Sequence, residues 1–178
     1  MPPLLLVAAR TLHSVALSFW LGGLIAIGAL VAPIAFHVTR SAPALAGNVP
    51  LQNALAGGIV GGSLHLFNYL TLACGAVLLV SSFALQPVSN RRWTGACLAV
   101  ILALLISALF LTLGLTPAMD AAQSRGDFRA FDRMHHSYEQ LSTLLQFPLL
   151  LLLTLFAALR DSQLPFPPQF WGARAGEE

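Results

Sequence analysis

The chain has 178 residues, enough for one domain, and 57% of them are hydrophobic while only 9% are charged. Soluble domains carry roughly 25% charged residues, so lipid must be the main solvent of this chain. A net charge of +2 without any basic run gives no argument for nucleic acid, so no nucleic-acid partner is expected, and the absence of lysine excludes Schiff-base or lysine-base catalysis.

Four segments are long and apolar enough to cross a bilayer as helices, which takes about 20 residues each. They cover about residues 12–36, 64–85, 95–115 and 141–159. We therefore expect an all-α integral membrane protein, a four-helix transmembrane bundle over residues 1–162 that contacts the lipid bilayer. Residues 163–178 begin with prolines and aromatic side chains, a composition that favours an extended tail at the headgroup level.

The placement of arginine predicts how these spans are oriented. Arg91 and Arg92 directly precede the third span, in a short loop that we expect on the cytoplasmic side. With four spans, Arg10, Arg160 and Arg174 fall on the same side. The pattern favours a bacterial-type cytoplasmic (inner) membrane with both termini in the cytoplasm.

The first span carries a ridge of small side chains, since Ser14, Ser18 and Gly22 recur every four residues. Such a ridge lets another helix approach closely, so it is a candidate interface for a homo-oligomer. His13 and Trp20 lie on a neighbouring stripe. We interpret Trp20 as a packing residue and His13 as an interfacial residue, because polar side chains at the ends of spans commonly extend toward water.

The second span is preceded by a segment, residues 39–62, that is rich in alanine, proline and glycine. We expect it to be helical from about Leu51 onward, as an extension of the span away from the cytoplasm. Within the span, His65 and Asn68 share a face because they are three residues apart. Asn68 lies deep enough to need a hydrogen-bond partner on another helix or in water. A structural bond and a ligand-binding role both fit it.

The stretch from Pro117 to Asp132 carries several charged residues and is expected to be the solvated connection between spans three and four. Beyond it, a 4-3-4 spacing places a polar stripe on the face of the fourth helix that is expected to face the bundle; its members are His135, Glu139, Ser142 and Gln146. Pro148 predicts a kink, because its ring removes a backbone hydrogen bond and clashes with the carbonyl four residues earlier. The stripe is either a seam that joins helices or the lining of a small polar cavity.

Depth separates the histidines into two groups. With the termini in the cytoplasm, His65 and His135 come toward the outer end of the bundle, while His13 lies near the inner end, roughly 30 Å away at 1.5 Å per residue. One haem iron or copper ion therefore cannot join His13 to His135. A site built from His65, His135 and Glu139 at the outer end, with Met134 nearby, stays open. The chain has neither a His-x-x-x-His nor a Cys-x-x-Cys pair to add support for a metal.

Several short motifs together resemble the transmembrane protein 205-like family, also called domain of unknown function 4149. They are His13, Trp20-Leu-Gly-Gly23, Pro33, Leu115-Thr-Pro117 and Phe131-x-x-Met-His135-x-Ser137. The resemblance covers most of residues 5–160 and implies the four-helix fold, but it implies no activity. The family pattern usually has His-Gly where this chain has His135-His136, so a side chain stands where glycine would allow close contact.

These features favour a non-enzymatic integral membrane protein with no assigned catalytic residue. Its outer polar seam would bind a small ligand or pack against a helix partner. The seam residues are His13, Asn68, Glu139, Ser142 and Gln146. The first alternative is a haem- or copper-binding protein with His65 and His135 as ligands. The second is a conduit for small solutes or ions, lined by the seam residues other than His13.

Overall fold

A computed structural model describes residues 3–86 and 91–162, and all the regular elements in these two ranges are helical. Four helices are long and apolar enough to cross a membrane, over Leu4–Ser41, Val49–Leu85, Trp93–Ser124 and Phe128–Leu159. The predicted class, an all-α protein with four membrane-spanning helices, is therefore confirmed. The predicted interfacial tail, residues 163–178, lies outside the described residues.

Each long helix except the second is built from three consecutive elements. In chain order, the elements are α1 (Pro3–Ala26), η1 (Ile27–Val31), α2 (Ala32–Ser41), η2 (Pro43–Leu45), α3 (Val49–Leu85), α4 (Arg91–Leu109), η4 (Phe110–Leu115), α5 (Thr116–Ser124), α6 (Phe128–Gln140), η5 (Leu141–Gln146) and α7 (Phe147–Ser162). The elements η1, η4 and η5 are π-helical, and η2 is a single 3-10 turn.

The second long helix begins where the composition predicted an extension. Asn48 caps α3 by accepting a hydrogen bond from the backbone N–H of Leu51, and Pro50 lies in the first turn, where its missing N–H costs nothing. The helix then continues for 37 residues. At 1.5 Å per residue this is about 55 Å, nearly twice the ~30 Å hydrocarbon core of a bilayer.

The connection expected between spans three and four, residues 117–132, consists of two helix ends joined by a short turn. Helix α5 continues to Ser124 and α6 starts at Phe128. Gly126 makes the turn with a φ of +72°, a conformation that glycine adopts without strain. Asp127 then caps α6 by accepting from the N–H of Ala130 at 3.0 Å. Good capping residues on both sides of the turn outweigh the polar composition.

The three π-helical segments share one cause, a proline two residues after the segment ends. Pro33, Pro117 and Pro148 follow η1, η4 and η5 in this way. In each case the residue just before the proline donates its N–H to the carbonyl five residues back, instead of four. Widening the turn relieves the clash between a proline ring and the carbonyl four residues before it. The distortion predicted at Pro148 therefore takes the form of a π-helix.

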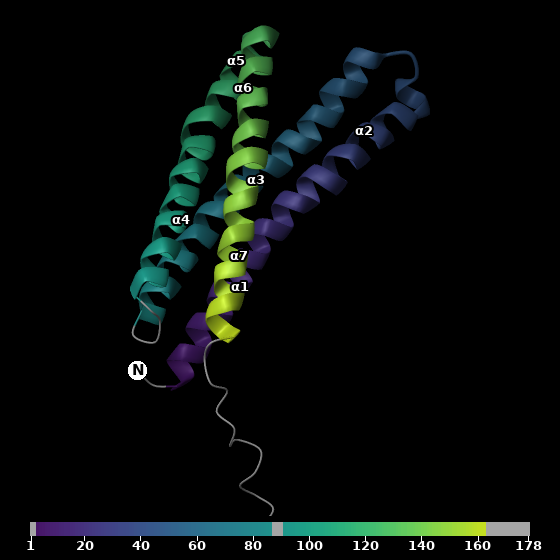
Figure 1. Cartoon of the computed structure of the whole chain (residues 1–178). Coiled ribbons are helices and arrows are strands. Elements are labelled where there is room, and N and C mark those ends of the chain that lie inside the picture. Colours follow the sequence, from purple (N-terminus) through teal and green to yellow (C-terminus); the bar gives the residue numbers. More distant parts are fainter. Residues whose placement is uncertain (1–2, 87–90, 163–178) are drawn as a thin grey trace, which may run out of the picture.

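The four long helices pack as two hairpins that meet at one end and diverge at the other (Figure 1). The start of α1 and the end of α7 lie at the same end of the molecule, which we call the terminal end. The α2–α3 and α5–α6 turns lie at the opposite end, which we call the hairpin end. There the α2–α3 hairpin leans away from α5 and α6, and α2 packs against α3.

The core lies toward the terminal end, where all four long helices contribute side chains. Trp20 is fully buried among Phe67, Leu78, Leu104 and Leu150. Two glycines let the helices come this close: a Cβ at Gly23 would collide with the ring of Phe67, and one at Gly75 would collide with Leu105. The predicted packing role of Trp20 is confirmed.

Adjacent glycines in α1 provide a direct test of this close approach. Gly23→Ala should destabilise the protein by about 1–3 kcal/mol, because the added methyl group overpacks the buried ring of Phe67. Gly22→Ala should leave the stability unchanged or slightly higher, because a Cβ there meets nothing within 4 Å. Thermal unfolding in the same detergent compares the two variants, and equal losses would contradict the packing described here.

Candidate functional site

Asn68 is the centre of a polar junction that joins three helices. Its side chain is only 3% exposed, in the middle of α3. The Tyr138 hydroxyl, from α6, donates to Asn68 Oδ1 at 2.7 Å, and Asn68 Nδ2 donates to Thr116 Oγ1, from α5, at 3.0 Å. Of the two partners expected for Asn68, another helix or water, the structure shows the first. The junction satisfies both ends of the amide in a place where lipid offers no partner.

The last acceptor of this junction is the Leu111 carbonyl, which belongs to the π-helix η4. The Thr116 hydroxyl accepts from Asn68 and donates to the Leu111 carbonyl at 2.7 Å. That carbonyl also accepts the backbone N–H of Thr116, in the π-helical pattern of η4. The hydrogen bonds thus run in one direction, from the Tyr138 hydroxyl through Asn68 and Thr116 to Leu111. Leu111, Leu115 and Met119 pack with Tyr138 around them.

One exposed histidine–carboxylate pair lies beyond the junction, toward the hairpin end, and two more lie on α6 beside the junction. His65 Nδ1 is 3.9 Å from Asp120 Oδ2, which links α3 to α5. On α6, Glu139 lies 3.6 Å from His135 Nδ1 and 3.8 Å from His136 Nδ1. The side chains of all five residues are at least 41% exposed. They remain available to a ligand in a way that Asn68 does not.

The two predicted haem or copper ligands have different acidic partners, Asp120 for His65 and Glu139 for His135. In the part of the chain that the structure describes, no group of three or more histidine, cysteine, aspartate or glutamate residues could hold a metal ion. The arrangement of these side chains therefore does not fit a metal centre built from His65, His135 and Glu139. Binding of haem or copper stays a prediction.

The polar stripe of the fourth helix does not keep one face. Gln146 is 2% exposed, and its Nε2 donates to Ser107 Oγ on α4 at 3.0 Å, whereas Glu139 is exposed. The expectation that all four residues face the bundle was wrong for Glu139. The His135 side chain is 41% exposed, so it faces the bundle only in part. The reason is η5, because a π-turn places about one extra residue in the helix and rotates the residues beyond it by roughly 100°.

His13 is also placed differently from the expectation. It is 2% exposed, and its Nδ1 lies 3.0 Å from Ser81 Oγ on α3, so the interpretation of His13 as an interfacial side chain was wrong. Ser81 donates its own proton to the Leu78 carbonyl at 3.1 Å, which leaves the hydroxyl oxygen to accept from the imidazole N–H. His13 therefore ties α1 to α3 near the terminal end, far from the Asn68 junction.

The partners in these bonds were not predicted from the sequence; they are Ser81, Ser107, Thr116 and Tyr138. Serine and threonine are common in membrane helices and bond to their own backbone, so their composition alone gives no signal. Tyr138 had a weak signal, since it lies seven residues after Phe131 and four after Met134, on one apolar face of α6. That face, rather than the polar stripe, packs against the bundle.

The small-residue ridge of α1 faces away from the other helices. Ser14, Ser18 and Gly22 are exposed, and a Cβ at Gly22 would meet nothing within 4 Å. The ridge is therefore open to lipid or to another chain, and its role as a homo-oligomer interface stays a prediction.

Comparison with known proteins gives one match. The model of a family described as a domain of unknown function (DUF4149) matches residues 15–127, which include Asn68 and Thr116. No curated protein and no solved structure matches the chain.

The Asn68 junction predicts unequal roles for the two tyrosines of the chain. Tyr138→Phe should lower the free energy of unfolding by about 1–2 kcal/mol, because it leaves the buried oxygen of Asn68 without a donor. Tyr69→Phe is the matched control, since Tyr69 is 54% exposed, and should change stability by less than about 0.5 kcal/mol. Unfolding in detergent measures both, and a Tyr138 effect no larger than that of Tyr69 would refute the junction.

Proposed function

The chain belongs to the DUF4149 family, whose model covers residues 15–127, and from that premise we propose that it is a non-enzymatic membrane protein with a structural polar interior and a ligand-binding hairpin end. In this proposal the interior holds the helices in place. The exposed groups at the hairpin end bind a small ligand or a partner.

One observation carries the proposal: the buried polar candidates each bond to a side chain on another helix. His13 pairs with Ser81, and Gln146 pairs with Ser107. Asn68 pairs with both Thr116 and Tyr138. Side chains used in this way support the polar seam as a means of joining helices, because each bond would have to break before the group could bind a solute. The seam therefore supports packing better than transport.

The groups that stay accessible are ionisable and lie between the Asn68 junction and the hairpin end. His65 and Asp120 span α3 and α5, and His135, His136 and Glu139 share one side of α6. Imidazole and carboxylate groups together favour a small polar or cationic ligand, or a charged segment of a partner. We assign ligand binding to these residues, and we assign Asn68, Ser142 and Gln146 to the support beneath them.

We also propose the narrower assignments that the sequence suggested. The resemblance through Trp20-Leu-Gly-Gly23 and His135 supports assigning the chain to the transmembrane protein 205-like proteins. The Arg91-Arg92 pair supports a cytoplasmic (inner) membrane with both termini in the cytoplasm. The exposed ridge at Gly22 supports a homo-oligomer, which would be detected as a lower mass in detergent for Gly22→Leu.

Gln146 separates a structural interior from a conduit. Gln146→Leu should lower the free energy of unfolding by about 1–2 kcal/mol, because Ser107 loses its partner. Adding Ser107→Ala should then cost little more, since the bond is already gone. Proteoliposomes holding wild type or Gln146→Leu should show the same ion and solute leakage.

Two results would overturn this proposal. The first is a flux in wild-type proteoliposomes that Gln146→Leu abolishes while unfolding stays unchanged, which would favour the conduit. The second is a visible absorption band or stoichiometric copper in protein that is expressed with iron and copper supplied. This signal would have to disappear in His135→Ala. That outcome would favour the haem- or copper-binding alternative and would assign His135 to the cofactor.

A further inference from the structure

The two turns at the hairpin end have opposite chemistry. The α5–α6 turn and the helix ends beside it carry acidic and basic side chains of both signs, which are Asp120, Arg125, Asp127, Arg129, Asp132 and Arg133. The α2–α3 turn has Arg40 alone, and no charged residue follows it until Arg91. Helix α3 therefore contains no aspartate, glutamate, lysine or arginine. Both turns lie on the same side of the membrane. If both projected into water, both should carry charged side chains.

Contacts between α3 and α5 fix how far the uncharged end extends. His65 lies level with Asp120, at 3.9 Å, and Asn68 lies level with Thr116, at 3.0 Å. Asp120 is the first charged residue of α5 and marks where that helix leaves the hydrocarbon. Residues 49–64 of α3 lie beyond this level, which is about 24 Å of helix at 1.5 Å per residue. Helix α5 itself ends only one turn later, at Ser124.

The extension exposes apolar side chains along its length. On α3, Leu51, Leu55 and Ile59 are each 42–52% exposed, and the same side of the helix continues with Leu66 and Leu70 toward the membrane-spanning part. On α2, Ile34 and Val38 are both 56% exposed. The exposed apolar surface of the spanning part thus continues onto the hairpin along this side of α3. A continuous surface of this kind indicates one continuous apolar solvent.

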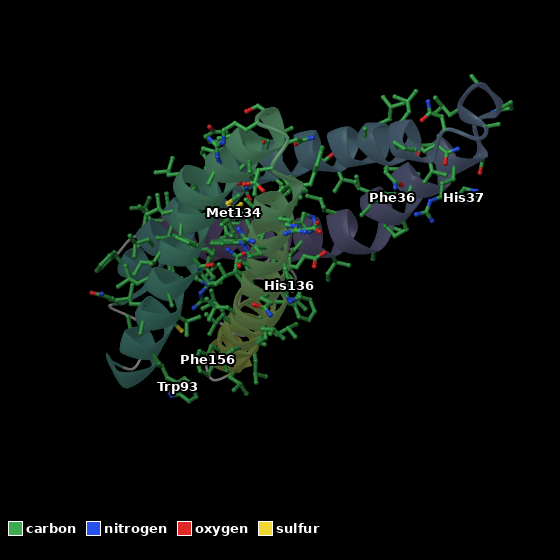
Figure 2. All side chains as sticks on the ribbon, turned by 90° about the horizontal axis from the view of Figure 1, so that it is seen from above. Phe36, His37, Trp93, Met134, His136 and Phe156 are labelled. Atoms are coloured by element: carbon green, nitrogen blue, oxygen red, sulfur yellow. The ribbon has the colours of Figure 1, made fainter. Side chains whose placement is uncertain are left out.

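The direction of the hairpin allows it to stay in that solvent. Figure 1 shows α2 and the first half of α3 leaning away from α5 and α6, and the view from above in Figure 2 shows them extending sideways. Phe36 and His37 lie far from Met134 and His136 in that view. The Arg40 guanidinium lies over the Phe36 ring, 5.6 Å from its centroid. An aromatic ring with an arginine is a typical anchor at the headgroup level.

We propose that the α2–α3 hairpin end, residues 34–59, binds the surface of the bilayer and lies along the leaflet into which the molecule opens. Its apolar side chains insert at the boundary between headgroups and acyl chains, and Arg40 and His37 reach the phosphate level. The partner is the lipid surface rather than a protein, because the exposed apolar residues continue those of the span and occupy both α2 and α3. The charged α5–α6 turn, in contrast, projects into water.

A fluorescent probe at two positions tests this arrangement. Leu55→Cys and Phe128→Cys are labelled with bimane in the full chain and reconstituted into phosphatidylcholine–phosphatidylglycerol liposomes, with labelled wild type as the background for Cys74 and Cys97. Both original side chains are apolar and exposed, Leu55 by 45% and Phe128 by 70%. The two positions therefore differ in the hairpin to which they belong and not in the polarity of the residue that is replaced. Phospholipids brominated near the headgroup should remove about half of the fluorescence at Leu55, as for a side chain at the acyl boundary.

At Phe128 the brominated lipids should have little effect, while aqueous iodide should quench strongly. Iodide quenching at Leu55 equal to that at Phe128 would overturn the proposal, because the hairpin would then project into water. Leu55 shielded from both quenchers would also overturn it, since a protein surface would then cover the hairpin. Ile59→Cys repeats the measurement one turn along α3, so that a local effect of the Leu55 substitution cannot decide the result.

Discussion

A proline inside an apolar helix is the constraint on which most of this structure depends. Pro33, Pro117 and Pro148 each interrupt a membrane-length helix, and lipid supplies no water to satisfy the carbonyl that a proline leaves unpaired. The chain answers with a π-helix before each one. The widened turn keeps the residue before the proline bonded. It also rotates the side chains beyond it, which is how Gln146 comes to face Ser107.

The second long helix has no proline beyond its first turn, and it becomes the common partner of the other three. Near the terminal end, Ser81 of α3 forms a hydrogen bond with His13 of α1. Some thirteen residues earlier it uses Asn68 to hold α5 and α6. Gly75, between these two points, lets Leu105 of α4 pack directly against its backbone. A straight helix can make such contacts at several levels, because its faces do not rotate along the way.

The sequence predicts what depends on composition and fails where helical register matters. Hydropathy predicted four membrane-length helices, and the cost of an unpaired amide in lipid predicted that Asn68 needs a partner on another helix or in water. The outward face of Glu139 could not be predicted from regular spacing, since η5 changes the register after Leu141. His13 was misplaced because its position near the end of a span suggested access to water. Only the fold shows that Ser81 lies opposite it. Tyr138 was missed because an aromatic residue on an apolar face gives no sign of a hydroxyl's partner.

The same requirement for hydrogen-bond partners explains why the buried polar side chains and the exposed ionisable side chains have different roles. Inside the bundle each buried polar side chain that the sequence marked as a candidate has a partner on another helix, so the interior gains rigidity and loses groups that could bind a solute. The histidine–carboxylate pairs lie on the exposed surface of the molecule, where each imidazole has a carboxylate beside it. The α2–α3 hairpin has little charge and packs mainly on itself, and only an apolar solvent can satisfy its exposed side chains. Within the described residues, chemistry with a ligand is thus favoured in the region that is both polar and accessible, the α5–α6 end with His65 of α3 beside it.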